Sequence, residues 1–358
     1  MLKGIPNVGN TCFLNTCLQI LLQTPELNFE ENEKGEEEKE KENENPKKEK
    51  QLWMEWKKWR DSTTDAGDIT TQFHEFHAFF KTIQHIANQK GFTLFTGYVQ
   101  NDLSEFLLFF MDTLHDYFKR PKNMKVEGTI ENDTDKMAIE CYKMLQEKYN
   151  NEYSEILDTF YGVYISTIYS TQDTIPQKMT SKPESFFLLD LPIPSTKTDI
   201  QPSTPSIYSC FDHYISPEYM ENGWIDEKTK ETKSVYKQMS FWNFPNILVI
   251  SLQRFHTTYL PNYKIQISKN TELVDFPIEN LDLSKYVVGY HPDTYIYDLY
   301  GIVNHIGDVN GGHYTAFVLS NAEKKWYHCN DHIIENVIDP QKMITPMAYV
   351  LFYRIRTL

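Results

Sequence analysis

The sequence predicts an α+β fold, with helices in its first part and strands in its second. Apolar residues recur at helical spacing after Cys12 and again after Asp102, which indicates two buried helices. Three later runs, at residues 246–255, 314–319 and 349–356, have the apolar, β-branched and aromatic content of strands. Helices and strands that follow one another in blocks, rather than alternating, are typical of α+β domains.

The first expected helix begins at Cys12, where Asn10 or Thr11 can cap its first turn. The Cys12 sulfur would then lie at the positive end of a buried helix, which lowers the pKa of a thiol. Most lone cysteines in such helices are small core residues, so a function for Cys12 depends on other residues. The apolar face of this helix comprises Leu14, Cys17, Leu18, Leu21 and Leu22.

Asp102 is expected to cap the second helix and to face a groove with its carboxylate. A further helix is expected near residues 137–149, where an imperfect apolar stripe can cover neighbouring strands or contact a partner. The run at 246–255 is apolar on both faces, as a central strand requires, so only Arg254 and Phe255 can contact a groove. The buried stripe of the second helix comprises Leu103, Phe106, Leu107, Phe110, Met111 and Leu114.

Composition favours one domain spanning residues 1–358, because 40% hydrophobic and 14% aromatic residues can fill a single large core. Residues 28–51 are rich in Glu and Lys and cannot bury a face, which indicates a solvated or loosely helical insertion. The net charge of −15, with no basic stripe, argues against a nucleic-acid partner. No apolar stretch is long enough to span a membrane and no signal peptide is present, so we expect an intracellular protein of the cytoplasm or nucleus.

Two short segments at opposite ends of the chain contain the residue types of a thiol protease. Residues 7–15 hold Asn7 and Cys12, and residues 311–331 hold His313 and Asn330. A thiol attacks a carbonyl as its thiolate, with an imidazole as base and a third group that fixes the imidazole tautomer. We expect these roles for Cys12, His313 and Asn330, and the Asn7 amide can stabilise the oxyanion beside the Cys12 backbone N–H.

Asp331 follows Asn330 and would point to the opposite face if the strand continued. We therefore expect Asp331 to act only as a neighbour of Asn330 or as its substitute. The remaining histidines of the second half are expected on strand surfaces and in loops; they include His291, His305, His328 and His332.

Both segments resemble the signature boxes of the ubiquitin-specific proteases, a family of papain-like deubiquitinating cysteine peptidases. The first box matches at Gly4, Asn7, residues 9–13, Asn15 and Gln19, and the second at residues 311–314, 326–327 and 330–331. The resemblance implies a fold with thumb, palm and fingers, the site lying between thumb and palm. It also implies the same roles for Asn7, Cys12, His313 and Asn330.

A third stretch, residues 97–107, resembles the Gln-Gln-Asp motif of that family, with Asn101 in place of the middle glutamine. The resemblance implies that Asp102 meets an arginine of the ubiquitin tail and that Gln100 bonds the tail's backbone. Gly312 and Tyr314 of the second box are expected to contact the same tail.

The clearest departure from the family concerns zinc, which many members hold in their fingers with two Cys-x-x-Cys pairs. The five cysteines here form no such pair and are odd in number, which also argues against a disulfide framework. We therefore expect fingers near residues 160–245 that lack zinc ligands, and no metal or other cofactor.

The sequence thus predicts hydrolysis of the peptide or isopeptide bond after the C-terminal glycine of ubiquitin, with ubiquitin and ubiquitinated proteins as partners. Two alternatives remain open. The first is a protease for a ubiquitin-like modifier, which would use the same boxes. The second is a ubiquitin-binding scaffold that has lost turnover.

Overall fold

The computed structural model describes most of the chain, and two compact units form from segments that alternate along it. The described residues are 2–29, 48–63, 68–171, 176–195, 204–225, 230–260, 264–308 and 311–356. The first unit comprises Met1–Lys119, Ser154–Leu157 and Tyr300–Met343. The second unit comprises Arg120–Tyr153, Asp158–Leu299 and Ile344–Leu358.

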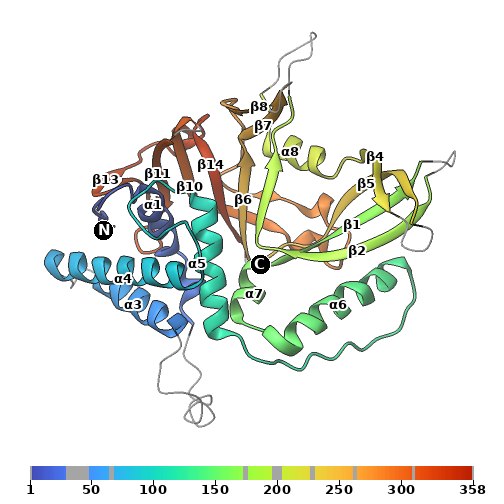
Figure 1. Cartoon of the computed structure of the whole chain (residues 1–358), viewed down its shortest axis with the longest axis horizontal. Helices are drawn as coiled ribbons and strands as arrows, with labels where there is room; N and C mark the ends of the chain where they lie inside the picture. Colours follow the sequence, from blue (N-terminus) through green and yellow to red (C-terminus); the bar gives the residue numbers. More distant parts are fainter. Residues whose placement is uncertain are drawn as a thin grey trace. The chain divides into compact units, whose positions relative to one another are not determined.

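Helices dominate the N-terminal part of the first unit (Figure 1). They are α1 (Cys12–Leu21), the 3₁₀ turn η1 (Pro25–Leu27), α3 (Lys48–Ser62), α4 (Ile69–Gln89) and α5 (Leu103–Phe118). All ten residues of α1 are buried, rather than one face as the sequence predicted. The reason is that α1 contacts α5 as well as two strands, β11 (Gly311–Leu319) and β12 (Trp326–Asn330).

Aromatic residues fill the space among α3, α4 and α5. The α3 side chains of Trp53, Trp56 and Trp59 are almost completely buried. Trp59 stacks on Phe79 of α4 with ring centroids 5.8 Å apart, and Trp56 meets Phe110 of α5 at 5.5 Å. These contacts anchor α5, whose N-terminal end carries Asp102.

The strands of the first unit form an antiparallel series in the order β13, β12, β11 and β10. Strand β10 (Ile296–Asp308) enters the first unit at residue 300, and β13 (Ile333–Asn336) is followed by the 3₁₀ turn η5 (Pro340–Met343). The register pairs Tyr314 of β11 with His305 of β10, whereas β12 pairs with residues 316–319 of β11. Residues 311–315 of β11 therefore extend past the end of β12.

The second unit is mostly β-structure. One sheet has the order β2, β1, β5 and β4, and a second series runs β14, β6 and β3. The strands are β1 (Gly162–Ser170), β2 (Lys178–Phe186), β3 (Leu188–Pro192), β4 (Glu218–Ile225), β5 (Thr232–Asn243), β6 (Ile247–Gln253), β7 (Phe255–Leu260), β8 (Lys264–Lys269), β9 (Leu281–Asp282) and β14 (Ala348–Ile355). The helices are α6 (Asp133–Glu152), α7 (Glu155–Phe160), which begins in the first unit, and α8 (Ile207–Tyr214), with 3₁₀ turns η3 (Ser284–Tyr286) and η4 (Pro292–Thr294).

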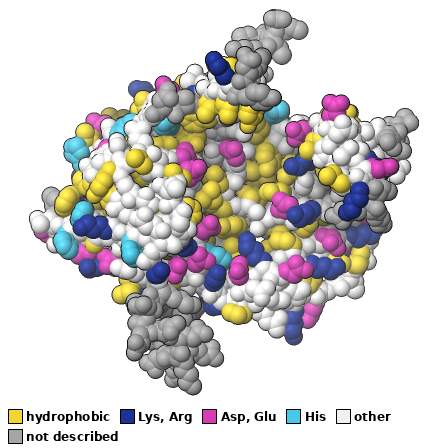
Figure 2. Space-filling model, in the orientation of Figure 1, with side chains coloured by type: hydrophobic (Ala, Val, Ile, Leu, Met, Phe, Trp, Pro, Cys, Tyr) yellow, Lys and Arg dark blue, Asp and Glu magenta, His cyan; other side chains and the backbone are white. Residues whose placement is uncertain are grey.

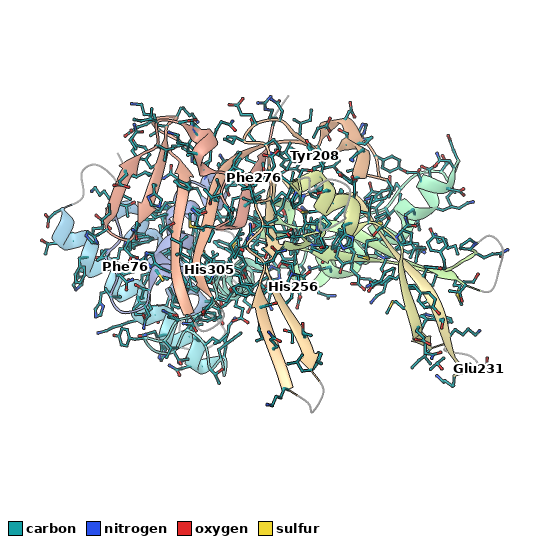
Figure 3. All side chains as sticks on the ribbon, turned by 90° about the horizontal axis from the view of Figure 1, so that it is seen from above. Phe76, Tyr208, Glu231, His256, Phe276 and His305 are labelled. Atoms are coloured by element: carbon teal, nitrogen blue, oxygen red, sulfur yellow. The ribbon has the colours of Figure 1, made fainter. Side chains whose placement is uncertain are left out.

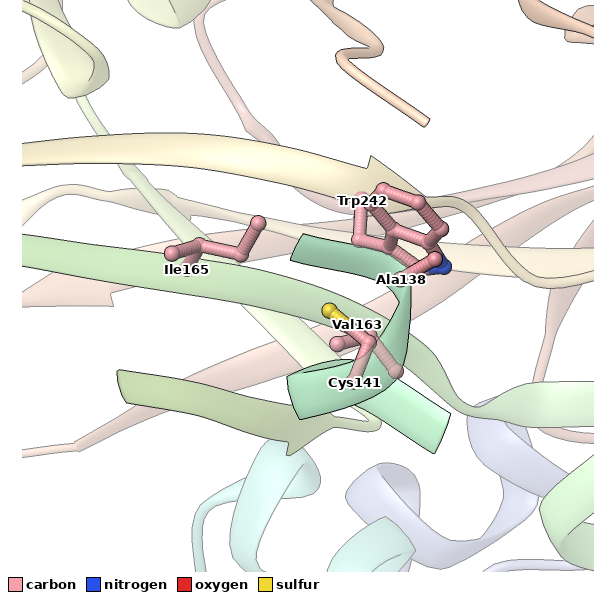
Figure 4. Packing of buried hydrophobic residues seen from close by; sticks show 5 residues of the cluster. All are labelled: Ala138, Cys141, Val163, Ile165 and Trp242. Carbon is pink, nitrogen blue, oxygen red and sulfur yellow. The ribbon is translucent and has the colours of Figure 1, made fainter. Parts of the chain in front are cut away.

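The helix expected near residues 137–149 is confirmed as α6, which begins with a capping box between Asn132 and Asp135. It lies along the curved sheet that contains β1 and β2 (Figure 1). Ala138 and Cys141 of α6 pack with Val163, Ile165 and Trp242 of the sheet (Figure 4). This segment therefore covers a face of the predicted fingers.

The strands expected at 246–255, 314–319 and 349–356 are confirmed as β6, part of β11 and β14. The expectation that Arg254 can contact a groove is wrong, because its side chain is fully buried. The chain then forms the hairpin β7–β8, which carries Tyr259 and Ile265 exposed to 77% and 60%. Figure 2 shows hydrophobic side chains gathered over this hairpin, and Figure 3 shows it projecting beyond the labelled His256.

Several sequence predictions fall partly outside the described residues. Residues 30–47 of the charged insertion do so, as do residues 172–175 and 226–229, near which the resemblance places the two Cys-x-x-Cys pairs. In the ranges that the structure covers, no three His, Cys, Asp or Glu side chains are grouped so as to hold a metal ion. None of the described helices is both long and apolar enough to cross a membrane.

Candidate active site

Cys12 is the first residue of α1, and the Asn7 side chain orders the loop that leads into this helix without capping it. Thr11 occupies the N-cap position but its side chain makes no capping hydrogen bond. The Asn7 side-chain oxygen instead accepts hydrogen bonds from the backbone N–H groups of Gly9, at 3.0 Å, and Thr11, at 3.2 Å. The prediction of a cap from Asn10 or Thr11 is therefore wrong, because the loop folds back over its own amides.

The loop before Cys12 is attached to the segment that leads into α5. The Asn10 side chain donates a hydrogen bond to the Tyr98 carbonyl at 2.8 Å. Gly9 has φ +118°, and a Cβ there would lie 3.1 Å from the Tyr98 ring. The positive φ and the short distance to Tyr98 explain why residue 9 is a glycine, since a side chain there would strain the backbone and displace the Tyr98 ring.

His313 and Asn330 lie on neighbouring strands and are joined by a hydrogen bond. The distance from His313 Nε2 to Asn330 Oδ1 is 2.7 Å. Because a carbonyl oxygen only accepts, Nε2 carries the hydrogen and a neutral ring keeps Nδ1 free to accept a proton. The structure thus brings the two residues together in the arrangement that the sequence predicted.

Cys12 differs from its prediction in one respect, because burial raises the pKa of its thiol above the ordinary value. The backbone N–H of Tyr314 acts in the opposite direction, the negative charge of Asp331 raises the pKa further, and the amides of Phe13 and Cys12 lower it. Within the described part of the chain, no hydrogen bond joins Cys12 Sγ to His313. The pKa of the Cys12 thiol would fall if the His313 imidazole approached the sulfur. In this structure the burial of the thiol outweighs the hydrogen bonds that lower its pKa.

Asp331 acts on the segment before α1 rather than on His313. Its φ of +50° is left-handed and follows the end of β12 at Asn330, so the extended geometry does not continue through Asp331. One carboxylate oxygen accepts a hydrogen bond from Asn15 Nδ2 at 2.8 Å, and the other from Asn7 Nδ2 at 3.0 Å. The Ile5 backbone N–H donates to the Asp331 carbonyl at 2.9 Å. Asp331 therefore holds the side chain of Asn7 through one hydrogen of its amide.

Asn15 and Gln19 were noted in the sequence only as matches to the first box, and the structure gives them contacts. Both are 1% exposed, and Gln19 Nε2 donates to the Lys3 carbonyl at 2.7 Å. Asn15 Nδ2 also lies 3.3 Å from the Ile5 carbonyl. The sequence could have predicted these contacts, because Asn15 and Gln19 are polar residues three and seven positions after Cys12 in an otherwise apolar helix.

The four predicted substrate residues form two hydrogen-bonded pairs, Gln100 with Gly312 and Asp102 with Tyr314. The Gln100 amide forms two hydrogen bonds with the Gly312 backbone. Asp102 caps α5 as predicted, accepting from the Ser104 N–H at 2.8 Å. Its other oxygen accepts from the Tyr314 hydroxyl at 3.2 Å.

His305 is buried against the second of these pairs, contrary to its expected place on a strand surface. It is 4% exposed, and its ring centroid lies 4.7 Å from that of Tyr314, which the register places opposite it on β11. Sequence reasoning missed it because the burial of a strand histidine depends on which residue the neighbouring strand places opposite.

Together these side chains can perform nucleophilic acyl transfer. A thiol at a helix N-terminus, an imidazole hydrogen-bonded to an amide oxygen, and amide N–H groups beside the thiol are the groups that this chemistry requires. Asp102 and Asp331 make the surroundings acidic, which suits a basic peptide.

Comparisons with known proteins match this chain to one family along nearly all of its length. The sequence model of the family described as ubiquitin carboxyl-terminal hydrolase matches residues 3–353. The Drosophila melanogaster protein ubiquitin carboxyl-terminal hydrolase Usp2 is 29% identical over 358 residues, which are 98% of this chain and 34% of that protein. Human ubiquitin carboxyl-terminal hydrolase 2 is 29% identical over 373 residues, which are 99% of this chain and 55% of that protein. The chain therefore spans about a third to about half the length of these relatives.

Solved structures show the same fold. The SAGA Ubp8/Sgf11/Sus1/Sgf73 DUB module bound to ubiquitin aldehyde contains a chain that matches with a TM-score of 0.67 and 23% identity, covering 100% of this chain and 70% of that one. The likeness confirms the predicted α+β fold of the papain-like ubiquitin-specific proteases.

Proposed function

Because the chain belongs to the ubiquitin carboxyl-terminal hydrolase family, we propose that it is a thiol-dependent deubiquitinase. It hydrolyses the peptide or isopeptide bond after the C-terminal glycine of ubiquitin, and ubiquitin and ubiquitinated proteins are its partners. The observation that carries the proposal is the His313–Asn330 hydrogen bond of 2.7 Å on strands that pack against the helix of Cys12.

The reaction follows from the roles of these side chains. His313 Nδ1 takes the proton of the Cys12 thiol while the sulfur attacks the carbonyl carbon of the terminal glycine. The resulting oxyanion is stabilised by the Asn7 side chain and the Cys12 backbone N–H. His313 then gives its proton to the leaving amine as the carbon–nitrogen bond breaks, which leaves a thioester.

Water completes the cycle. His313 removes a proton from water as its oxygen attacks the thioester, and the proton passes to the departing Cys12 sulfur. The products are a free ubiquitin carboxylate and the original thiol. Asn330 keeps the imidazole in one tautomer through both steps, since its oxygen accepts from Nε2.

Asp102, Gly312 and Tyr314 are proposed to contact the ubiquitin tail, whereas the Gln100 amide, for which the resemblance implies the same, already bonds the Gly312 backbone. Acidic surroundings suit the two arginines of the ubiquitin tail, Leu-Arg-Leu-Arg-Gly-Gly. The two terminal glycines of that tail fit a narrow channel that would exclude larger side chains. Support also comes from the solved relative, which holds ubiquitin aldehyde.

We also propose that both units belong to one catalytic domain, with the fingers near residues 160–245 and no zinc. A location inside the cell, in the cytoplasm or nucleus, is proposed from the substrate and from five unpaired cysteines.

The test is hydrolysis of a ubiquitin–fluorophore conjugate, together with covalent labelling by a ubiquitin C-terminal electrophile. We expect both reactions in the wild type and neither in Cys12→Ala, which still binds ubiquitin. Turnover by Cys12→Ala would contradict the assignment. A folded wild type that binds ubiquitin without turnover would be a scaffold, and one that reacts only with probes of another modifier would be a protease for that modifier.

A further inference from the structure

Gln100 forms a two-point contact with the residue that precedes His313. The Gly312 backbone N–H donates to Gln100 Oε1 at 3.2 Å, and Gln100 Nε2 donates to the Gly312 carbonyl at 3.3 Å. One side-chain amide thus satisfies both polar groups of a strand residue, as a neighbouring strand would. Strand β12 does not do so here, because its pairing with β11 covers only residues 316–319.

The glycine pair in β11 leaves space for this contact. A Cβ on Gly311 would lie 2.4 Å from Gln100 Oε1, and Gly311 also has φ +150°, which other residues rarely adopt. A Cβ on Gly312 would lie 2.3 Å from His305 Nε2 on the other side. Contacts within the chain therefore require both glycines, independently of any substrate.

The contact acts on His313 through a shared peptide group. The Gly312 carbonyl that accepts from Gln100 belongs to the peptide bond whose nitrogen is that of His313. A hydrogen bond to this oxygen fixes the orientation of that peptide plane. Asn330 fixes the imidazole ring at the other end of the residue, 2.7 Å from Nε2. Backbone and ring are thus held by two different amides.

We propose that Gln100 is a positioning residue for the base: it holds the Gly312–His313 peptide so that the imidazole is directed toward Cys12. The proposal rests on the proposed function for the identity of the base. It assigns Gln100 a role inside the enzyme, whereas the family resemblance implies a bond to the substrate backbone. The two roles differ in what they predict without ubiquitin.

Alkylation of Cys12 by iodoacetamide measures activation of the thiol without any substrate. The other four cysteines are at most 2% exposed, and a Cys12→Ser blank corrects for them. The rate is measured across pH 5 to 10 in wild type, His313→Ala, Gln100→Met and Gln100→Glu. Methionine keeps the length of glutamine without its hydrogen bonds, and glutamate keeps an acceptor for the Gly312 N–H. Asp331, Asp102 and His305, the titratable groups nearby, are unchanged in all of these variants.

Gln84→Met is the matched control, because Gln84 donates to the Gly97 carbonyl of the same loop at 3.1 Å but does not contact Gly312. We expect Gln100→Met to slow alkylation near pH 7 about tenfold and to move the profile toward that of His313→Ala, as the loss of two neutral hydrogen bonds would do. The alkylation rate of Gln100→Glu should lie between those of wild type and Gln100→Met, and the rate of Gln84→Met should match that of wild type. With the ubiquitin–fluorophore conjugate, kcat should fall by a similar factor while KM changes by less than about twofold.

A Gln100→Met profile that coincides with wild type would overturn the proposal, and a rise in KM would then assign Gln100 to the substrate. A His313→Ala profile identical to wild type would overturn it as well, since there would be no activation to lose. If no variant cleaves ubiquitin but the alkylation profiles shift as expected, the positioning role stands and the proposed function fails.

Discussion

The carboxylate of Asp331 lies 2.8 Å from Asn15 Nδ2, although 316 positions separate the two residues. The second oxygen accepts from Asn7, so the turn after β12 holds the segment that leads into α1. The same carboxylate contributes to the raised pKa of Cys12 through its charge. Asp331 therefore has two opposing effects on the site, one geometric and one electrostatic.

Asp331→Ala should lower kcat for ubiquitin–fluorophore hydrolysis by about tenfold to a hundredfold, because Asn7 and Asn15 both lose an acceptor. In Asp331→Asn, loss of the negative charge should lower the pKa of Cys12, so alkylation of the thiol should reach its plateau at a lower pH. The measurement is the alkylation rate against pH. Asp339→Asn, which removes a carboxylate from an exposed turn, serves as the control, and equal behaviour of the two variants would contradict this account.

Asn330→Ala should lower kcat by about a hundredfold, since the imidazole loses the acceptor that fixes its tautomer. Asn330→Asp keeps an acceptor and should stay within about tenfold of wild type. The added charge favours the imidazolium, so the acid limb of its kcat/KM profile should move to higher pH. Equal losses in Ala and Asp would show that Asn330 does more than accept one hydrogen bond.

Arg254→Met should destabilise the second unit by about 3 kcal/mol, because the buried guanidinium donates to three backbone carbonyls. The acceptors are Ala348 at 2.6 Å, Glu272 at 2.9 Å and Asn270 at 3.1 Å. Urea unfolding at several pH values is the measurement.

The pH dependence of that difference has a definite sign. Burial lowers the pKa of Arg254 to about 10, so the folded state binds this proton less tightly than the unfolded state. Stability gained by deprotonation appears only as pH rises through about 10. Between pH 6 and 9 both states keep the proton, and the loss in Arg254→Met should be constant. A loss that varies across this window would show that another group titrates with it.

Trp56→Phe should change the stability of the first unit by less than about 1.5 kcal/mol, whereas Trp56→Ala should cost about 3 to 5 kcal/mol. The indole is fully buried, and among the described residues its N–H has no hydrogen-bond partner. Phenylalanine removes this unsatisfied donor and keeps most of the packing against Phe110. Thermal unfolding of both variants is the measurement, and a large loss in Trp56→Phe would reveal a partner for the N–H.

The sequence predicted the elements that carry the site, because each depends on local pattern. Helical spacing after Cys12 places the sulfur at a helix N-terminus, and the run at 314–319 places His313 at the start of a strand. Residue types then predicted that Asn330 would bond the imidazole. Each of these inferences needs only a few neighbouring residues and a requirement of the chemistry.

The features that the sequence did not predict all depend on contacts between segments that are distant in the chain. The left-handed backbone at Asp331 turns its carboxylate toward α1, and nothing in the local sequence reports that conformation. His305 is buried because β11 places Tyr314 opposite it. The raised pKa of Cys12 comes chiefly from the removal of water by packing, which no motif encodes.

The tryptophans of the chain are concentrated in the first unit. Of six tryptophans in the chain, four lie in the first unit, at positions 53, 56, 59 and 326, and two lie in the second, at 224 and 242. Five of the six are buried: the three in α3, Trp326, and Trp242 of the second unit, so four of the five tryptophans expected to emit at shorter wavelength lie in the unit that contains Cys12. Loss of this emission during denaturation reports that region directly, ahead of any assay of turnover.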